Sequence, residues 1–391
     1  MRTAIFARMQ WQPLRAIACK HKKGQAPLYV SNISHGRRRL STRRLEQEPK
    51  ALLALVETAQ SEKRTRRNNL GIVSSFAIVT TLATAFLIAD PESREVKKIF
   101  DAPRFTPFTI VKREEVSPTS IILTLRPQTL VNRPRMLPDD PYHACWEKGS
   151  WSVEFKQPDL QIARSYTPLP PTKGDPKAKG DLRFLIRREH RGEVSGYLHA
   201  LGEGAQIQLR GPNEEFSLPE SVQDVLFLAG GTGIAPALQV AYTLLEEKDT
   251  QPEKPKIHIV WANRKRADCE GGHDASNPNT WEAHKTGQIV QELEILQQRY
   301  PGQLSVEYLV DEEGKYLDQR RISSLMKVTT KDKGGAGTTE IDSQLLFVSG
   351  PEGFISYIAG PKRWEYGREG QGELGGLLRQ IGLKTWKVWK L

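Results

Sequence analysis

The sequence predicts three parts: a single N-terminal transmembrane helix, an antiparallel β-barrel, and an α/β domain built on a parallel sheet. Three observations lead to this order. Residues 70–89 carry no charged side chain, short alternating strands begin near residue 105, and strands alternate with helices from residue 224. A chain of 391 residues with 38% hydrophobic residues is large enough for two folded domains and an extension, so a wholly disordered protein is excluded.

The N-terminal region is strongly basic. Residues 1–45 contain eleven Lys or Arg and no Asp or Glu, which accounts for the whole net charge of +11. The rest of the chain is neutral, which argues against a nucleic-acid-binding body. An Arg-rich, acid-free segment in which Ile5, Phe6, Met9 and Leu14 share a helix face is typical of a mitochondrial presequence. The alternative for residues 37–39 is a nuclear signal or a basic tail.

A basic linker, residues 46–69, leads into the apolar segment 70–89. Twenty helical residues span about 30 Å, the thickness of a bilayer core. Basic residues at 63–67 precede the segment, and Asp90, Glu92 and Glu95 follow it. We therefore expect a single-pass helix in the mitochondrial inner membrane, with residues 90–391 facing the intermembrane space. A buried core helix is the alternative.

The barrel is expected over residues 100–218, because alternating segments broken by Pro or Gly are typical of antiparallel strands. Strands are predicted at 108–116, 120–127, 150–157, 164–169, 182–188 and 205–211.

The α/β domain is expected over residues 219–391. Strands are predicted at 224–229, 256–262, 304–310 and 344–350, and helices at 236–247 and 289–300. Residues 268–287 and 329–342 are predicted to be surface loops, and no function is assigned to them.

Two short motifs in the barrel suit a flavin nucleotide. In Arg164-Ser165-Tyr166-Thr167, alternation places Arg164 and Tyr166 on one face, where a guanidinium can pair with a pyrophosphate and a ring can pack on a flavin. In Gly192-Glu193-Val194-Ser195, we expect Ser195 to cap a short helix whose free amides bind phosphate. Alone, the first motif is more typical of strand packing and the second of a capped turn.

Two further motifs lie at predicted strand ends in the α/β domain. Gly230-Gly231-Thr232-Gly233-Ile234-Ala235-Pro236 joins a strand to a helix, as a dinucleotide site requires, with glycines that let a pyrophosphate reach the backbone. Pro236 fits the first helical turn. Ser349-Gly350-Pro351 follows the last predicted strand, where parallel sheets bind ligands. An ordinary Gly-Pro turn is the alternative.

The basic turn Asn263-Arg264-Lys265-Arg266 follows the strand 256–262. Arg264 there would accept the 2′-phosphate of NADPH, so a strict preference for NADH is not expected. The alternative is a solvated basic turn.

The cysteines exclude several metal and haem sites. Cys19, Cys145 and Cys269 form no CxxC unit, so a disulfide scaffold, a thiolate zinc cluster and a covalent haem site are excluded. The sequence allows either two free thiols or a Cys145–Cys269 disulfide bond.

The Arg-Ser-Tyr-Thr motif and the three glycine-containing motifs together resemble, in type and order, the NADH–cytochrome b5 reductase branch of the ferredoxin-reductase-like flavoproteins. The resemblance covers roughly residues 104–360. It implies an FAD-binding barrel, an NAD(P)-binding domain, and hydride transfer to the flavin followed by release of single electrons.

The resemblance also implies roles for particular residues. Arg164, Ser165, Tyr166, Thr167, Gly192, Val194 and Ser195 would hold FAD, with Thr167 near flavin N5. Gly231, Thr232, Gly233, Pro236, Gly350 and Pro351 would hold NAD(P)H. Ser349 stands where the family often has Cys beside the nicotinamide, so hydride transfer would be slower or differently tuned. The chain also extends beyond the usual terminal aromatic residue, which leaves open what shields the flavin.

A narrower resemblance, to the fungal cytochrome c import factors of mitochondria, rests on the presequence, the membrane span and the extended tail. It implies delivery of electrons to a haem or haem protein, with cytochrome c and its haem-attachment machinery as partners, inner-membrane lipid around the anchor, and no nucleic acid. The competing interpretation is a redox-inactive assembly factor that keeps the fold. No histidine pair in the sequence has the spacing of a buried haem site.

Overall fold

The computed structural model describes residues 99–391, except 101, 133–139, 172–179, 249–253, 273–285, 332–342, 366 and 384. The predicted presequence, basic linker and membrane helix (1–45, 46–69 and 70–89) lie outside the described residues. Within the described part of the chain, no helix is both long and apolar enough to cross a membrane.

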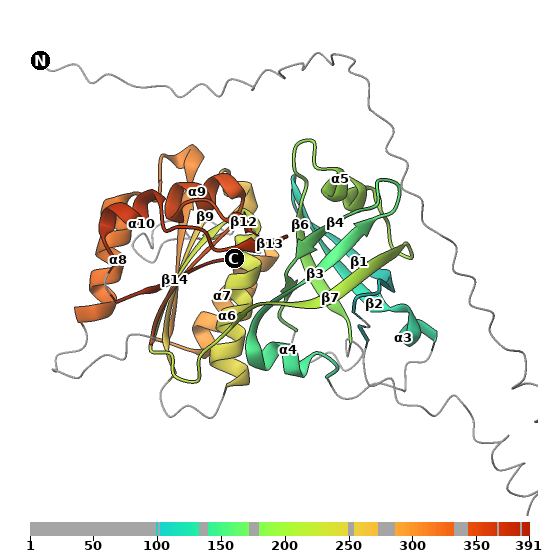
Figure 1. The fold of residues 1–391 in the computed structure, drawn as a ribbon, viewed down its shortest axis with the longest axis horizontal. Helices are drawn as coiled ribbons and strands as arrows, with labels where there is room; N and C mark the ends of the chain where they lie inside the picture. Colours follow the sequence, from blue (N-terminus) through green and yellow to red (C-terminus); the bar gives the residue numbers. More distant parts are fainter. Residues whose placement is uncertain are drawn as a thin grey trace, which may run out of the picture. The chain divides into compact units, whose positions relative to one another are not determined.

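The first lobe is an antiparallel sheet of seven strands, in the spatial order β4-β3-β7-β1-β2-β6-β5 (Figure 1). The strands are β1 (Thr106–Ser117), β2 (Ser120–Pro127), β3 (Gly149–Gln157), β4 (Ile162–Tyr166), β5 (Pro168–Leu169), β6 (Leu182–Arg187) and β7 (Gln206–Ser217). The two outer strands, β4 and β5, are consecutive in the chain and separated only by Thr167, so the sheet curls back on itself as the predicted barrel.

The single strand predicted for residues 164–169 is therefore two strands. Residues before Thr167 pair with β3, with Tyr166 opposite Val153, whereas Pro168 and Leu169 pair with β6. The chain crosses from one edge of the barrel sheet to the other at Thr167. Short helices α3 (Gln128–Asn132), α4 (His143–Lys148) and α5 (Glu193–Ala200) accompany the barrel.

The second lobe is a fully parallel sheet in the order β10-β9-β8-β11-β14. Its strands are β8 (Asp224–Gly230), β9 (Lys256–Asn263), β10 (Leu304–Val310), β11 (Gln344–Ser349) and β14 (Lys387–Lys390). The fifth strand, β14, was not anticipated from sequence. A small hairpin, β12 (Arg363–Glu365) and β13 (Arg368–Gly370), lies outside this sheet.

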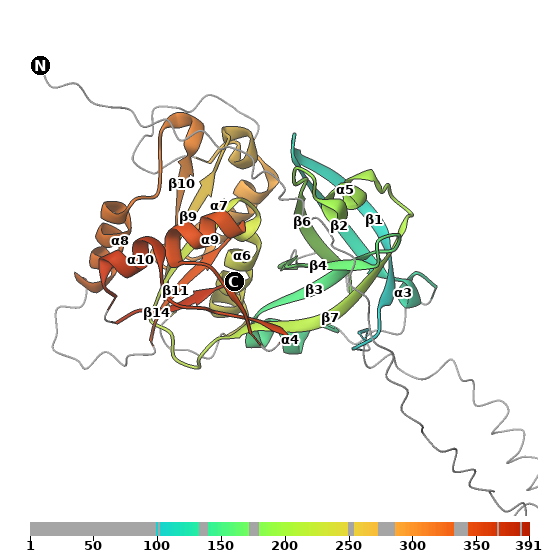
Figure 2. The ribbon, with the colours of Figure 1, turned by 45° about the horizontal axis from the view of Figure 1, so that its top comes forward.

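Helices cover both faces of the parallel sheet (Figure 2). On the face toward the barrel lie α6 (Ile234–Tyr242), continued by a π-helical turn (Thr243–Glu247), and α7 (Gln288–Arg299). On the other face lie α8 (Gln319–Lys331), α9 (Glu352–Ala359) and α10 (Gly376–Ile381). Helix α8 takes up the start of the stretch that was expected to be a loop from residue 329, so that loop prediction was wrong for residues 329–331.

The burial of β8 explains its uninterrupted apolar sequence. Val225, Phe227 and Ala229 belong to the core beneath α6 and α7, whereas Leu226 and Leu228 belong to the core beneath α8 and α9. A strand buried on both faces cannot carry alternating polar residues, and such strands are typical of parallel sheets.

A buried glutamine on α6 joins the two lobes. The Gln239 side-chain oxygen accepts hydrogen bonds from the backbone N–H of Trp151 (3.0 Å) and from Ser150 Oγ (3.2 Å). Its amide nitrogen donates to the carbonyl oxygens of Trp151 (3.1 Å) and Pro168 (3.0 Å). Because all four bonds are made out of contact with water, this contact holds α6 firmly against β3 and β5.

Candidate functional site

The carboxyl ends of β8 and β11 lie side by side at the point where the strand order reverses. From β8 the chain proceeds through β9 to β10 on one side, and β11 pairs with β8 on the other. A parallel sheet binds its ligand in the crevice at such a switch point. The two predicted glycine motifs follow these two strands directly, so the structure brings them together as the sequence predicted.

The turn after β8 presents bare backbone. Gly231 adopts a positive φ of 53°, and its carbonyl oxygen accepts a hydrogen bond from Trp261 Nε1 at 2.8 Å. A Cβ placed on Gly231 would meet one heavy atom within 4 Å, Nη1 of Arg187 at 3.4 Å. Thr232 is half-buried beside it, and α6 starts three residues after Gly231. An open backbone at a helix N-terminus fits the pyrophosphate of a dinucleotide.

Gly233 packs tightly against the turn after β11. A Cβ there would lie 2.2 Å from the carbonyl oxygen of Ser349, and a Cβ on Gly350 would lie 2.8 Å from the carbonyl oxygen of Gly230. Two turns are therefore packed backbone against backbone. The glycine at 233 is required by this packing, whereas Gly231 is the one that leaves room for a ligand. Pro236 lies in the first turn of α6, as predicted.

The flavin strand has the predicted alternation. Arg164 lies opposite Phe155 and Tyr166 opposite Val153, both interior positions of the barrel. The Tyr166 ring packs on Phe155 with centroids 4.8 Å apart, and burial raises the pKa of the Tyr166 phenol to about 12. Ser165 is exposed and lies on the opposite face of β4, next to Glu154.

The Arg164 guanidinium is exposed, and Nη1 donates to the carbonyl oxygen of Ala163 at 2.8 Å. None of the ion pairs within the described ranges includes it. Arg164 therefore keeps most of its donors available for an anionic ligand, as pairing with a pyrophosphate requires.

The glycine turn before α5 corrects one prediction. Gly192, not Ser195, is the N-cap of α5, and Ser195 lies inside the first helical turn. Ser195 Oγ accepts from the N–H of Glu189 at 3.1 Å and donates to the carbonyl oxygen of Gly192 at 3.2 Å. Serine was expected to cap the helix, but here it fixes the preceding turn. The first amide that bonds back along the helix is that of Gly196, so the amides of residues 193–195 remain for a phosphate.

Val194 anchors this turn, because its side chain is 3% exposed and packs in the barrel core. Helix α5, which follows this turn, contacts β4, so the turn and the Arg164 strand lie close together. The donor set of this region, a guanidinium beside helix-terminal amides, fits the pyrophosphate of FAD.

The two residues expected near the reacting atoms lie one in each lobe. Thr167 is half-buried at the crossing between β4 and β5, beside the Pro168 carbonyl that Gln239 holds. Ser349 ends β11, is 6% exposed, and packs on Gly233 at the start of α6. Gly350 and Pro351 complete the turn into α9.

Acidic residues face the basic turn after β9. Arg266 binds Glu313 through two hydrogen bonds of 2.6 Å, and its backbone N–H donates to Glu312 Oε1. Burial raises the pKa of Asp311, and the exposed Arg264 opposes this shift. The positive charge of this basic turn was predicted to accept a 2′-phosphate. It is partly balanced by the acidic turn after β10.

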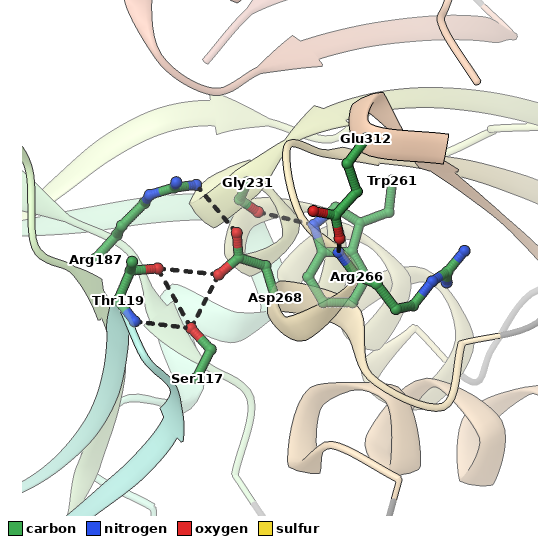
Figure 3. A network of polar contacts seen from close by, with 8 residues as sticks. All are labelled: Ser117, Thr119, Arg187, Gly231, Trp261, Arg266, Asp268 and Glu312. Carbon is green, nitrogen blue, oxygen red and sulfur yellow. Dashed lines mark hydrogen bonds and ion pairs between the residues drawn. The ribbon is translucent and has the colours of Figure 1, made fainter. Parts of the chain in front are cut away.

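One polar network was not predicted (Figure 3). Asp268 Oδ1 accepts hydrogen bonds from Ser117 Oγ and Thr119 Oγ1, both at 2.9 Å, and Oδ2 lies 3.7 Å from Nη1 of Arg187. The stretch from residue 268 was interpreted as a loop without function, yet Asp268 joins the second lobe to the barrel. Its partners lie about 150 positions away in the chain, so no local pattern signals the contact.

Both described cysteines carry free thiols, Cys145 half-buried and Cys269 buried. A Cys145–Cys269 bridge is therefore absent, and the other alternative, two free thiols, holds for these residues. Across the described residues, no group of three His, Cys, Asp or Glu is placed to hold a metal ion.

Comparison with known proteins finds one nucleotide-binding domain in each lobe. The oxidoreductase FAD-binding domain family matches residues 150–218, and the oxidoreductase NAD-binding domain family matches residues 227–271. The chain is 25% identical over 231 residues to NADH-cytochrome b5 reductase 2 of Kluyveromyces lactis, covering 59% of this chain and 67% of that protein. These matches confirm the resemblance to the ferredoxin-reductase-like flavoproteins and to their NADH–cytochrome b5 reductase branch that the sequence motifs predicted.

Other relatives extend the comparison. An uncharacterized FAD-binding protein of Schizosaccharomyces pombe is 28% identical over 288 residues, covering 73% of this chain and 85% of that protein. The cytochrome b5 reductase domain of Ulva prolifera nitrate reductase is 15% identical, with a TM-score of 0.48, over 75% of this chain and all of that domain. The flavoprotein described here is therefore a reductase whose cofactors are FAD and NAD(P)H.

Proposed function

We propose that this flavoprotein transfers electrons from NAD(P)H through FAD to a haem carried by another protein, in the mitochondrial intermembrane space. The observation that carries the redox part of the proposal is that the chain matches both an FAD-binding and an NAD-binding domain, and it is supported by the Gly231 turn at the switch point and the exposed Arg164 guanidinium on β4. A protein that served only as a scaffold would need neither site.

When bound, FAD supplies the chemistry, accepting two electrons from NAD(P)H and releasing them singly. The chain's own residues position the two sites relative to each other. Gln239 fixes Pro168, beside Thr167, against α6, and the packed turns at Gly233 and Ser349 fix the start of the same helix. One rigid helix thus sets the position of the residues expected at the flavin relative to those expected at the nicotinamide.

A partner haem is proposed because several relatives are named NADH-cytochrome b5 reductases, so their named acceptor is a haem protein. We infer that electrons leave the flavin at an exposed edge, toward a haem protein such as cytochrome c or a component of its haem-attachment machinery.

The membrane part of the proposal is supported by sequence alone. The uncharged segment 70–89, the basic arm before it and the acidic residues after it favour an inner-membrane anchor with the folded part in the intermembrane space. The arm 1–45 favours import into mitochondria.

The second candidate, a redox-inactive assembly factor, is favoured by one observation: Ser349 occupies a position where the family often has Cys. The test is anaerobic addition of NADH, and separately NADPH, to the full-length protein in detergent, with ferric cytochrome c or ferric cytochrome b5 as acceptor. We expect bleaching of the flavin absorbance, followed by haem reduction only when the flavoprotein is present.

Flavin that stays oxidised under both nucleotides would favour the scaffold. Reduced flavin that transfers nothing to any haem would contradict the proposed acceptor. Stoichiometric haem in the purified chain itself would contradict a haem carried by a partner.

A further inference from the structure

The small hairpin of β12 and β13, close to the C-terminal end of β14, exposes a tryptophan (Figure 1). Trp364 lies opposite Glu369 in the hairpin and is 73% exposed, more than any other large apolar side chain among the described residues. All three residues of β12 are exposed, so the ring does not pack into a core. Tryptophan is highly buried on average, because its ring gains a large hydrophobic free energy on leaving water.

A buried lysine holds the base of this hairpin. Lys390, the last residue of β14, is 3% exposed, and its Nζ donates hydrogen bonds to the carbonyl oxygens of Pro361 (3.0 Å) and Glu373 (2.9 Å). These two carbonyl groups lie on either side of the hairpin in the chain. The Lys390 backbone also exchanges hydrogen bonds with the Gln371 side chain, at 2.7 and 2.9 Å. A two-stranded hairpin is only marginally stable by itself, so these contacts fix its position.

This attachment places the hairpin at the carboxyl end of the parallel sheet. Lys390 pairs with Val348 of β11, the residue before Ser349. Neighbouring strands lie about 4.8 Å apart, so the base of the hairpin is close to the turn expected at the nicotinamide. A partner bound to the hairpin is therefore held at the end of the sheet where the two glycine turns lie.

The charges of the hairpin favour a protein partner over a lipid surface. Lys362 pairs with Glu369, and Arg363 pairs with Glu365, both at 3.2 Å. Residues 361–373 contain three basic and three acidic side chains, so the segment has no net charge. Anionic lipids attract clusters of Lys and Arg without balancing acids. An exposed tryptophan among paired charges is instead typical of the anchor residue of a protein interface.

We propose that the hairpin β12–β13 is the docking site of the haem protein that accepts electrons, with Trp364 as its anchor and Lys390 as the residue that positions it. The inference rests on the proposed function, because it names the surface at which that partner binds. Complexes of electron-transfer proteins bury little surface, so one aromatic anchor can supply much of the affinity. Residues 46–391 have no net charge to steer a partner from a distance, which leaves recognition to local contacts.

The test measures binding and electron transfer separately, on full-length, FAD-loaded protein in detergent. Binding of ferric cytochrome c, and separately of ferric cytochrome b5, to the oxidised flavoprotein gives a Kd, and steady-state reduction gives kcat and KM. In Trp364→Ala we expect Kd and KM for the haem protein to rise roughly fivefold or more, with kcat unchanged. Reduction of ferricyanide should also be unchanged, because so small an acceptor needs no docking surface. Trp364→Phe keeps a ring and should retain most of the affinity.

Tyr316→Ala is the matched control, because Tyr316 is also an exposed aromatic residue but follows β10, at the opposite edge of the sheet. It should leave Kd and KM unchanged. Lys390→Met removes the two hydrogen bonds at the base of the hairpin and should raise KM as Trp364→Ala does. The double variant should show no further rise, because both changes act through the same ring.

Unchanged Kd and KM in Trp364→Ala would overturn the docking site, even where the wild-type protein reduces haem. An effect of Trp364→Ala that appears in lipid nanodiscs and is absent in detergent would assign the ring to the membrane and would equally overturn it. Losses that add in the double variant would contradict the positioning role of Lys390. Wild-type protein that reduces ferricyanide, yet neither binds nor reduces either cytochrome, would contradict the proposed function itself and the docking site with it.

Discussion

Arg164 and Arg183 show how differently two arginines of one barrel are used. Arg183 is buried, paired with Glu292 and bonded to the Pro170 carbonyl, so its charge is consumed by the fold. Arg164 is exposed, with only its neighbour's carbonyl as acceptor. The charge of Arg164, unlike that of Arg183, is therefore available to a ligand.

Arg164→Ala should therefore weaken FAD binding while leaving the fold intact. Loss of a charge-assisted contact of about 1.5–3 kcal/mol corresponds to more than tenfold in affinity. Flavin absorbance per mole of purified protein, measured after dialysis, checks this. Lys112→Ala is the control, since Lys112 is an exposed β1 residue with only a surface ion pair to Glu114. Equal flavin content in wild type and Arg164→Ala would refute the assignment.

We expect Gly233 to contribute to the stability of the fold, in addition to any role in binding the nucleotide. A methyl group there would overlap the Ser349 carbonyl, which is backbone and cannot turn aside. Gly233→Ala should lower the free energy of unfolding by about 1–3 kcal/mol through this overpacking. Gly353→Ala is the matched control, because a Cβ at Gly353 in α9 meets nothing within 4 Å and alanine favours a helix. Thermal unfolding followed by circular dichroism compares the two, and equal midpoints would contradict the packing argument.

The residues of the 3₁₀ turn Arg266–Cys269 contact three different parts of the protein. Arg266 binds the acidic turn after β10, Asp268 binds the barrel, and Cys269 packs in the core beneath α6 and α7. Because a single short turn makes all three contacts, we expect it to stay closed in the folded protein.

The Cys269 thiol reports on that turn. Burial raises its pKa from the ordinary value of 9.0 to about 11, so the reactive thiolate at pH 8 is roughly a hundredfold scarcer than for an ordinary thiol. Alkylation by iodoacetamide should be very slow at pH 8 and should rise steadily between pH 8 and 10, because this whole range lies below the pKa. Peptide mass spectrometry gives the rate, with the half-buried Cys145 as the internal comparison. Labelling of Cys269 as fast as Cys145 at pH 8 would show that the turn opens.

The net charge of the chain is distributed unevenly along the sequence. Residues 1–45 hold all of the excess positive charge, while residues 46–391 are neutral overall. Long-range steering of an acceptor by the rest of the chain should therefore be weak, and complementarity with a haem protein should be local.

The proposed topology is tested with isolated mitochondria. Protease added after rupture of the outer membrane should remove residues 90–391, because the basic side of segment 70–89 is retained in the matrix. A matrix protein serves as the control for an intact inner membrane. Protection of the folded part until the inner membrane is also opened would reverse the proposed orientation.

The sequence was sufficient to predict features that depend on residues close together in the chain. Alternation placed Arg164 and Tyr166 on one face of their strand, and apolar runs such as β8 predicted buried strands in a parallel sheet wound with helices. The order of the motifs, from Arg164 to Gly350, was enough to predict an FAD-binding and an NAD(P)-binding domain, and the family models match both. These features depend on periodicity and on spacing along the chain, which the sequence shows directly.

Only the tertiary structure decided the rest, because the deciding contacts join residues far apart in the chain. The packing of Gly233 on Ser349 separates a structural glycine from the ligand-facing Gly231, although both stand in one motif. The bonds of Asp268 to Ser117 and Thr119, and its approach to Arg187, turn an unremarkable loop residue into a link between lobes. Neither contact leaves a local pattern, since hydrogen bonding and close packing depend on distance in space and not on position in the sequence.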